Sequence, residues 1–326
     1  MLNWGIIGLG KMANQFASSI VDVDNSTLVC IASKSVDKLH KFSEKFKIKQ
    51  ENKFSNYEDL LQSKKIDAIY ISTLNNTHID LIMSAAKNKK KILCEKPICL
   101  NLNEAQQAYD FVKKHHTPFY EAIAYRSHPQ TKCLLTLINS GEIGKIYKIE
   151  SSFGYKVKRI KKDSRLFNKE LGGGAILDVG CYPISFFNLF CSKDNQLRII
   201  NSKGNICNTG VDDTAEINIS IGNDIKAYGK VSLNENLDNT CKVYGENGII
   251  NIPSPWLPSE KSYIEVIKVN SYYKKFTNTS KNIFSIQIKS VANLFSDKSN
   301  EFNQLVNIEE SIQIMKILDT WKRNLL

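Results

Sequence analysis

The stretch that decides the fold reads Trp4-Gly-Ile-Ile-Gly8-Leu9-Gly10-Lys11-Met12-Ala13. Its apolar start predicts a strand, and residues 14–20 are typical of a helix. A sharp turn from strand to helix favours glycine at the turn and where the backbone approaches a pyrophosphate, and a third small residue lets the two elements pack closely. We therefore expect helix N–H groups to face the phosphates of a nucleotide. The expected cofactor contacts are Gly8, Gly10, Lys11, Met12 and Ala13. The alternative is a glycine turn that binds no ligand.

The first 122 residues alternate between strand patterns and helix patterns. After the opening stretch come a strand at 27–33 and a helix at 36–46, a strand at 68–72 and a helix at 77–88, a strand at 91–94 and a helix at 103–115, and a strand at 118–122. Such alternation predicts βαβ units around a parallel sheet. We expect residues 1–122 to form a doubly wound Rossmann domain of the α/β class.

Residues 123–326 differ in pattern and are expected to form a second domain. Ile217, Ile219 and Ile221 alternate with polar residues, which predicts an antiparallel sheet with one buried and one polar face. An amphipathic helix closes the chain. Because few helices remain to cover the far face of the sheet, we expect it to join copies of the chain in a homodimer or larger homo-oligomer.

Length and composition agree with a two-domain protein. The 326 residues exceed an average single domain, and 42% hydrophobic residues suffice for real cores. No apolar run approaches a membrane span, and the first strand begins near residue 3, so we expect no membrane partner, no signal peptide and a cytoplasmic location. The eight cysteines form no CxxC pair and have no matched histidines, so we expect neither a metal site nor disulfides.

The net charge of +11 raises the question of a nucleic-acid partner. Lysine is spread along the whole chain, and no helix-turn-helix, aromatic platform or metal finger accompanies it, so we expect none. The densest cluster is Lys156-Val-Lys-Arg-Ile-Lys-Lys162, followed by Arg165. Two interpretations of it stay open: a solvated loop, or a loop that holds an anionic group of a substrate.

Three separated motifs resemble those of the Gfo/Idh/MocA family of oxidoreductases. They are the turn at 8–13, Glu95-Lys96-Pro97, and Gly172-Gly-Gly-Ala-Ile-Leu-Asp178-Val-Gly-Cys-Tyr182-Pro183. Shorter pieces at 72–78 and 121–129 are also similar, so the resemblance runs nearly end to end. It implies an N-terminal Rossmann domain and a C-terminal α/β domain with a large open sheet that often serves dimerisation. Tyrosine at 182, where many members carry histidine, makes the chain most similar to the dihydrodiol dehydrogenase, glucose-fructose oxidoreductase and anhydrofructose reductase branch.

The resemblance also implies which further residues form the site. The cofactor contacts that it adds are Thr73, Asn75, His78, Glu95 and Lys96. The substrate contacts are Lys96, Tyr125, Arg126, Asp178 and Tyr182. For His78 two roles stay open, because it either lines the nicotinamide side of the cleft or caps the helix that follows it.

Lys96 makes chemical sense on its own. It follows the strand at 91–94 and so stands at the carboxyl end of a parallel strand, where open α/β sheets bind ligands. Pro97 biases it away from the helical region, which turns its side chain toward the cleft. A lysine there polarises a carbonyl or makes a neighbouring group a stronger acid.

Asp178 and Tyr182 are four residues apart, which predicts that they share one face of a helix entered through three glycines. Tyr182 can donate a proton to a developing alkoxide, and a nearby ammonium makes the phenol a better acid. Asp178 can bind a substrate hydroxyl or orient Lys96. The alternative is that Tyr182 is a packed aromatic ring and Asp178 a helix cap.

Cofactor choice is predicted from the end of the second strand. NAD-binding folds usually place an acidic residue there for the ribose hydroxyls. Here Ser33 can donate a hydrogen bond while Lys34 or Lys38 supplies charge, so NADP is favoured over NAD.

These features together predict an NAD(P)-dependent oxidoreductase. It transfers a hydride between the nicotinamide and a hydroxyl-bearing or carbonyl carbon of a sugar or polyol-like small molecule. Tyr182 is the expected general acid/base, Lys96 its electrostatic partner and Asp178 the orienting group. The alternative is a regulatory protein on the same fold that senses the cofactor without catalysis. Loss of Lys96 or of the proton donor would favour it, and both are present.

Overall fold

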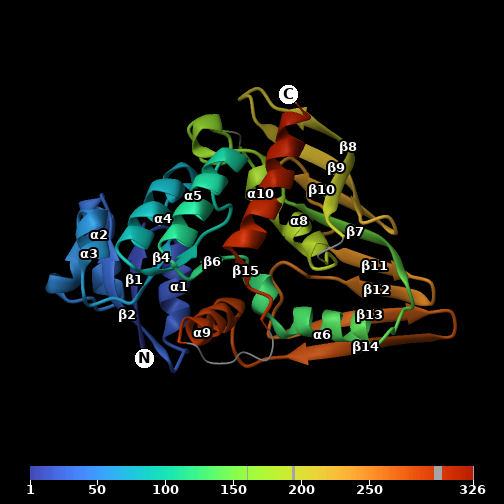
Figure 1. The fold of residues 1–326 in the computed structure, drawn as a ribbon, viewed down its shortest axis with the longest axis horizontal. Coiled ribbons are helices and arrows are strands. Elements are labelled where there is room, and N and C mark those ends of the chain that lie inside the picture. The colour runs from blue at the N-terminus through green and yellow to red at the C-terminus, as the bar shows by residue number, and fades with distance from the viewer. Residues whose placement is uncertain (160, 193–194, 297–302, 326) are drawn as a thin grey trace. The chain divides into compact units, whose positions relative to one another are not determined.

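The computed structural model describes residues 1–159, 161–192, 195–296 and 303–325, which form two compact units (Figure 1). Unit 1 comprises Met1–Cys99, Asn103–Ser127 and Lys281–Ile312. Unit 2 comprises Leu100–Leu102, His128–Ser280 and Gln313–Leu326. Each unit has its own sheet.

Unit 1 contains a seven-stranded sheet in the order β15-β6-β5-β4-β1-β2-β3. Its strands are β1 (Leu2–Ile7), β2 (Ser26–Ala32), β3 (Lys53–Phe54), β4 (Ala68–Ile71), β5 (Lys91–Cys94), β6 (Phe119–Glu121) and β15 (Val306–Asn307). The helices are α1 (Lys11–Ile20), α2 (Val36–Lys45), α3 (Tyr57–Gln62), α4 (His78–Lys87), α5 (Leu102–Lys114) and α9 (Ile283–Phe295), with short 3-10 turns η1 (Gln50–Asn52), η2 (Asn75–Thr77) and η3 (Ala124–Ser127). All pairings are parallel except β15 with β6, and the strand order reverses at β1. The predicted doubly wound Rossmann sheet is confirmed.

Both faces of β1 are covered, which explains its unbroken apolar sequence. On one face the indole of Trp4 packs against Phe16 of α1 and Phe295 of α9, with ring centroids 5.3 and 5.9 Å apart. On the other face Gly5 lies against Leu60 of α3. Burying aromatic side chains of this size contributes about 1.5–3 kcal/mol each.

Unit 1 also includes a segment from far along the chain. The predicted second domain was 123–326, but residues 281–312 group with unit 1. The reason is tertiary: the Ser285 hydroxyl of α9 donates to the Ser19 carbonyl at 2.9 Å, the Ser19 hydroxyl donates to Asn282 at 3.1 Å, and β15 pairs with β6. The single boundary at 122/123 therefore does not describe how the chain divides.

Unit 2 contains an eight-stranded sheet in the order β14-β13-β12-β11-β7-β10-β9-β8. Its strands are β7 (Ile146–Gly154), β8 (Leu197–Ile206), β9 (Asp212–Ile221), β10 (Ile225–Ser232), β11 (Cys241–Gly245), β12 (Gly248–Ile252), β13 (Lys261–Lys268) and β14 (Ser271–Asn278). The helical elements are α6 (Pro129–Asn139), η4 (Lys169–Leu171), α7 (Ala175–Asp178), α8 (Cys181–Asn188) and α10 (Ile308–Arg323), the last of which begins in unit 1. The pairings are antiparallel except β10 with β7.

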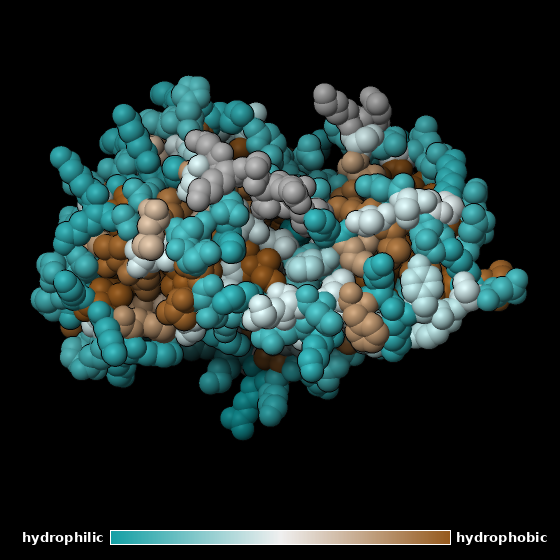
Figure 2. Space-filling model, turned by 90° about the horizontal axis from the view of Figure 1, so that it is seen from below, coloured by the Kyte–Doolittle hydropathy of each residue, from teal (hydrophilic) through white to brown (hydrophobic). Residues whose placement is uncertain are grey.

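Alternation along the strands sets the two faces of this sheet apart. Ile217, Ile219 and Ile221 are buried, as their spacing predicts, and the residues between them are partly exposed. Helices α6, α7 and α8 pack against the sheet. None of the helices in the described ranges is long and apolar enough to span a membrane. Hydrophilic side chains cover most of the face that Figure 2 shows, with hydrophobic residues visible as smaller patches between them.

Candidate functional site

The turn after β1 has the geometry that a dinucleotide needs. Gly8 has a φ of +88°, and a Cβ there would lie 2.7 Å from the Thr73 side chain, so only glycine fits. A Cβ on Gly10 would meet no heavy atom of the described chain within 4 Å, so the backbone there borders open space. Gly10 is the N-cap of α1, no side chain caps the helix, and its first turn carries no acid. These features fit a bound pyrophosphate.

The other predicted residues of this turn differ in exposure. Ala13 is fully buried, as close packing of helix and strand requires, whereas Lys11 is exposed and Met12 partly exposed. Ser72, which the sequence interpretation missed, donates its hydroxyl to the Gly8 carbonyl at 2.8 Å and so fixes the turn.

The turn after β2 holds the residues expected to select the cofactor. Ser33 is buried, and its hydroxyl accepts from the Ser35 N–H at 3.1 Å. Ser35 in turn accepts from the Lys38 N–H at 3.3 Å and caps α2. The Lys34 ammonium lies 5.4 Å from the centre of the Tyr57 ring. The expected positive charges are therefore at the end of β2, while the acidic side chain of the next helical turn, Asp37, is paired with Lys41 at 3.0 Å.

Two more predicted residues follow β4, at the same edge of the parallel sheet. Thr73 accepts a hydrogen bond from the Thr77 hydroxyl at 2.7 Å, and Asn75 lies almost buried in η2. Because β1, β2, β4 and β5 are parallel, the turns that follow them lie at one edge of the sheet. The glycine turn and Lys96 belong to that edge.

The segment around Lys96 is fixed on both sides by buried side chains. The Lys96–Pro97 peptide bond is cis. The Pro97 carbonyl accepts a hydrogen bond from Nδ1 of His78 at 2.9 Å, and the Ile98 N–H donates to Glu121 at 3.0 Å. Before Lys96, the Glu95 carboxylate accepts from the Tyr70 hydroxyl. Lys96 itself is partly exposed. The backbone that carries it is therefore held in place.

His78 and Glu121 both have shifted pKa values. Complete burial lowers the pKa of His78 to about 4, so the imidazole is neutral and Nδ1–H is the donor to Pro97. Thr77 is the N-cap residue of α4, so His78 does not cap this helix but is its first residue. Burial raises the pKa of Glu121 to about 7, against the opposing effects of the Ile98 N–H and of the Lys96 charge. The sequence interpretation did not include Glu121, although a charged residue at the end of an apolar strand was a signal for it.

Tyr125 and Arg126 lie in η3 and are both buried. The Arg126 guanidinium pairs with Glu310 at 2.8 Å and donates to the Gln304 carbonyl at 2.9 Å. Arg126 therefore contacts both Gln304, which precedes α10, and Glu310, which lies in the first turn of that helix. Its predicted contact with substrate, like that of Tyr125, stays a prediction.

In unit 2, Asp178 and Tyr182 lie beside the end of β7. One oxygen of the nearly buried Asp178 carboxylate accepts from the Tyr155 hydroxyl at 2.7 Å, and the other pairs with Arg165 at 3.0 Å. The partly exposed Tyr182 ring packs edge-on against Phe153, with centroids 5.0 Å apart. Phe153 and Tyr155 are two residues apart, so they bring their partners to one region.

One expectation about this pair was wrong. Asp178 and Tyr182 do not share a continuous helix, because α7 ends at Asp178 and α8 begins at Cys181. The break occurs because Val179 leaves the helical conformation, with φ −122° and ψ −13°. The start of α7 is held by a residue that the sequence interpretation missed: the buried Asp212 carboxylate accepts from the Ile176 N–H at 2.7 Å.

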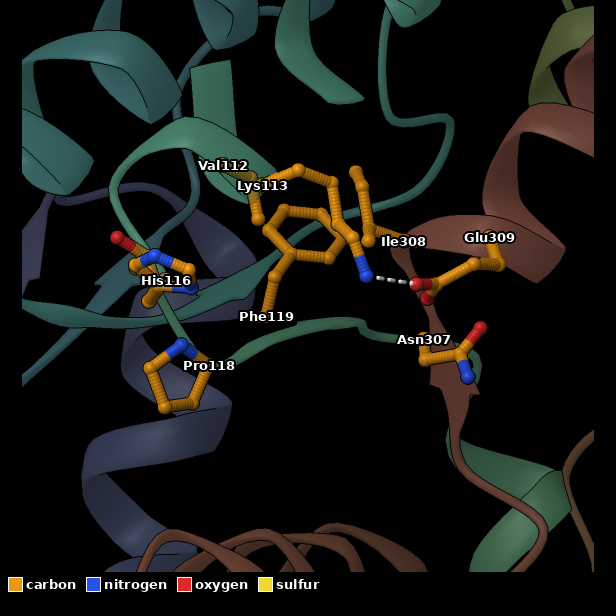
Figure 3. A pocket seen from close by; sticks show the side chains of 9 residues that line it. Val112, Lys113, His116, Pro118, Phe119, Asn307, Ile308 and Glu309 are labelled. Carbon is orange, nitrogen blue, oxygen red and sulfur yellow. Dashed lines mark hydrogen bonds and ion pairs between the residues drawn. The ribbon is translucent and has the colours of Figure 1, made fainter. Parts of the chain in front are cut away.

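Two cavities of unit 1 lie apart from all these residues. One, of about 360 Å³, lies between the end of α5 and the start of α10 (Figure 3), and its side chains include the Lys113–Glu309 ion pair at 2.8 Å. The other, of about 400 Å³, borders β2 and the segment 46–52. Neither contains a predicted site residue. The site is therefore assigned from the turns at the sheet edge and not from these hollows.

Comparison with protein families gives two matches. Residues 2–122 match the model described as "Oxidoreductase family, NAD-binding Rossmann fold". Residues 133–251 match the GFO/IDH/MocA C-terminal domain.

Individual proteins agree with these matches. The chain is 30% identical over 277 residues to a trans-1,2-dihydrobenzene-1,2-diol dehydrogenase of Xenopus tropicalis, which covers 84% of this chain and 80% of the relative. An aldose-aldose oxidoreductase from Caulobacter crescentus, solved with glycerol, has a TM-score of 0.88 at 17% identity, covering 99% of this chain and 97% of the other. A 3-ketoreductase from Actinomadura kijaniata, solved with NADP and TDP-benzene, has a TM-score of 0.87 at 20% identity, covering 99% and 98%. At these identities the two structures show likeness of fold alone. The family matches and the Xenopus relative show that the chain belongs to the Gfo/Idh/MocA family of NAD(P)-binding oxidoreductases.

Proposed function

We propose that this oxidoreductase acts on a hydroxyl-bearing or carbonyl carbon of a sugar, polyol or related diol. The observation that carries the proposal is the placement of the open glycine turn and of the braced Lys96 segment at one edge of the parallel sheet. The relatives named above, a diol dehydrogenase and sugar oxidoreductases, support this substrate class.

The proposed roles follow from the chemistry of each side chain. The bound nicotinamide supplies or accepts the hydride at C4. Tyr182 transfers the proton of the reacting hydroxyl, and its contact with Phe153 and Trp256 holds the ring in place. Lys96 polarises the carbonyl through its charge. Asp178, held by Tyr155 and Arg165, orients a substrate hydroxyl.

The test is a set of three variants of the holoenzyme. We expect Tyr182→Phe to keep the aromatic packing and cofactor binding but to lose about 10² to 10⁴ in turnover, the usual contribution of a positioned general acid. Lys96→Met should lose at least as much. The double variant should lose less than the product of the two, because both groups act on one step.

Matched controls separate this result from general damage. Tyr147→Phe and Lys64→Met change exposed residues of the same types outside the proposed site and should leave turnover unchanged. Near-normal turnover of Tyr182→Phe would move the proton donor elsewhere. Tight cofactor binding with no turnover on any of the aldoses, ketoses, inositols and diols tried would favour the sensing protein instead.

We further propose that NADP is preferred over NAD. The positions of Ser33, Lys34 and Lys38 at the end of β2 support this, because a donor and two cations suit a 2′-phosphate and a carboxylate would repel it.

We also propose that the chain forms a homodimer or larger homo-oligomer through the outer face of the unit 2 sheet. Tyr244, Ile249, Ile267 and Tyr272 pair one with the next across β11, β12, β13 and β14, so they form a row on one face. Ile267 and Tyr272 at the end of this row are 38% and 57% exposed. An exposed apolar row of this kind favours a self-complementary contact.

A further inference from the structure

The basic cluster of the sequence lies in a loop of unit 2 whose two ends meet at one carboxylate. We call residues 156–159 and 161–164, the described residues between Tyr155 and Arg165, the basic loop. The residue before the loop, Tyr155, donates to Oδ2 of Asp178 at 2.7 Å. The residue after it, Arg165, pairs with Oδ1 of the same carboxylate at 3.0 Å. Both ends of the basic loop are therefore held at Asp178.

The start of the basic loop is fixed further by its backbone. The Tyr155 and Val157 N–H groups donate to the carbonyls of Ser232 and Leu233 at 3.0 and 2.9 Å, and the Lys156 N–H donates to Asn236 at 2.9 Å. Four described residues follow Tyr155 and four precede Arg165, so none of them is more than four positions from an anchor. At about 3.3–3.6 Å per residue, the Cα atom of each lies within about 14 Å of the Cα atom of Tyr155 or Arg165.

The basic loop concentrates positive charge that the described chain does not neutralise. It contains five cations and one acid, Asp163. The five cations are all exposed, and no ion pair of their side chains occurs within the described residues: Lys156, Lys158, Arg159, Lys161 and Lys162. Holding like charges together in a closed loop has an electrostatic cost that a bound anion removes.

We propose that the basic loop binds an anionic group, a phosphate or carboxylate, carried by the sugar-like substrate that Asp178 orients. This inference rests on the proposed function and adds to it the charge of the substrate. Lysine ammonium and arginine guanidinium groups are the usual partners of phosphate and carboxylate oxygens.

The experiment measures binding and turnover separately, with the NADP-loaded protein. Calorimetric titration compares glucose with glucose 6-phosphate, glucuronate and UDP-glucose, which distinguishes a phosphate, a carboxylate and a diphosphate as the source of the charge. We expect at least one anionic probe to bind about tenfold or more tightly than glucose, as charge-assisted hydrogen bonds allow. The preference should weaken as NaCl is raised, because exposed charges are screened.

A pair of matched variants assigns the effect to the loop. Lys158→Gln with Arg159→Gln should abolish the preference, whereas Lys64→Gln with Lys114→Gln, which removes two exposed cations of unit 1, should retain it. Equal binding of all four probes, no binding of any anionic probe, or a preference that survives in the loop variant would overturn the inference. Turnover of glucose equal to that of the anionic sugars would leave the proposed oxidoreductase function intact. Anion binding without turnover of any sugar would contradict that function alone.

Discussion

At the scale of single residues, the candidate site depends on two buried groups, His78 and Glu121. His78 and Glu121 lie on either side of the segment that carries Lys96, and each bonds its backbone. Burial lowers the pKa of His78 and raises the pKa of Glu121. In both cases it favours the neutral form of the side chain, because a charge is costly in the core. We interpret both as positioning residues.

Glu121 gives a prediction about stability and pH. Its pKa is raised from 4.5 to about 7 because the carboxyl is fully buried. The folded protein therefore keeps a proton that the unfolded chain releases, and the stability from this proton is complete below pH 4.5 and is lost as the pH rises through 7. Glu121→Gln keeps an acceptor for the Ile98 N–H but does not titrate. The free energy of unfolding of the natural protein minus that of the variant should fall by up to about 3 kcal/mol between pH 4.5 and 7.

Urea unfolding of both proteins across this range checks the prediction. His78 has the opposite dependence, since its lowered pKa contributes stability above pH 6.5 that is lost as the pH falls through about 4. It is present in both proteins, so it cancels in the difference. A difference that stayed constant with pH would show that folding does not raise the pKa of Glu121.

At the scale of elements, the hydrophobic pattern of the sequence predicted the individual strands and helices of unit 1 better than the contacts between distant residues. The alternation of apolar runs and amphipathic stretches gave β1, β2, β4 and β5 with their helices, and β5 begins and ends at the expected residues. It missed the break between α7 and α8, because the spacing of Asp178 and Tyr182 suits one helix as well as two. It also missed Ser72, Asp212 and Glu121, whose partners are backbone groups far along the chain. Such contacts leave no periodic signal in a sequence.

The turn between β2 and α2 gives a prediction about cofactor choice. NADPH should bind more tightly than NADH, because the charges at this turn suit the 2′-phosphate. Ser33→Asp should reverse or abolish the preference, since it places a carboxylate against that phosphate. Titration by nicotinamide fluorescence measures both affinities, and Ser63→Asp, at a partly exposed serine after α3, is the control. An unmodified protein that bound NADH as tightly as NADPH would contradict the prediction.

At the scale of the whole molecule, each sheet contains a strand pairing that its local pattern did not predict. The segment 281–312 returns to the first unit and adds β15 as an antiparallel edge, and β7 pairs in parallel with β10 in a sheet that is otherwise antiparallel. Both depend on contacts between residues more than 75 positions apart. The polar alternation of β9 did predict the two-faced character of the second sheet.

The outer face of that sheet is large enough for a stable dimer. Its eight strands, at about 4.8 Å spacing, make it about 38 Å wide. A stable interface needs only about 800 Å² from each partner, which strands of five to ten residues supply at that width. The row from Tyr244 to Tyr272 provides an apolar stretch across β11 to β14, and pairs such as Lys203 with Glu216 provide polar side chains at the other end of the same sheet.

We therefore expect light scattering to give about twice the monomer mass of 37.0 kDa or a larger multiple across a wide concentration range. Ile267→Glu should shift the protein toward the monomer. In a two-fold contact both copies present the same surface, so one substitution places two carboxylates in the apolar contact. Leu257→Glu, which changes a more exposed apolar residue outside the sheet, should leave the mass unchanged. A monomer mass for the unmodified protein at every concentration would rule out assembly. An oligomer that Ile267→Glu left intact would instead place the contact on another surface, and the open face of the sheet would then be covered by water alone.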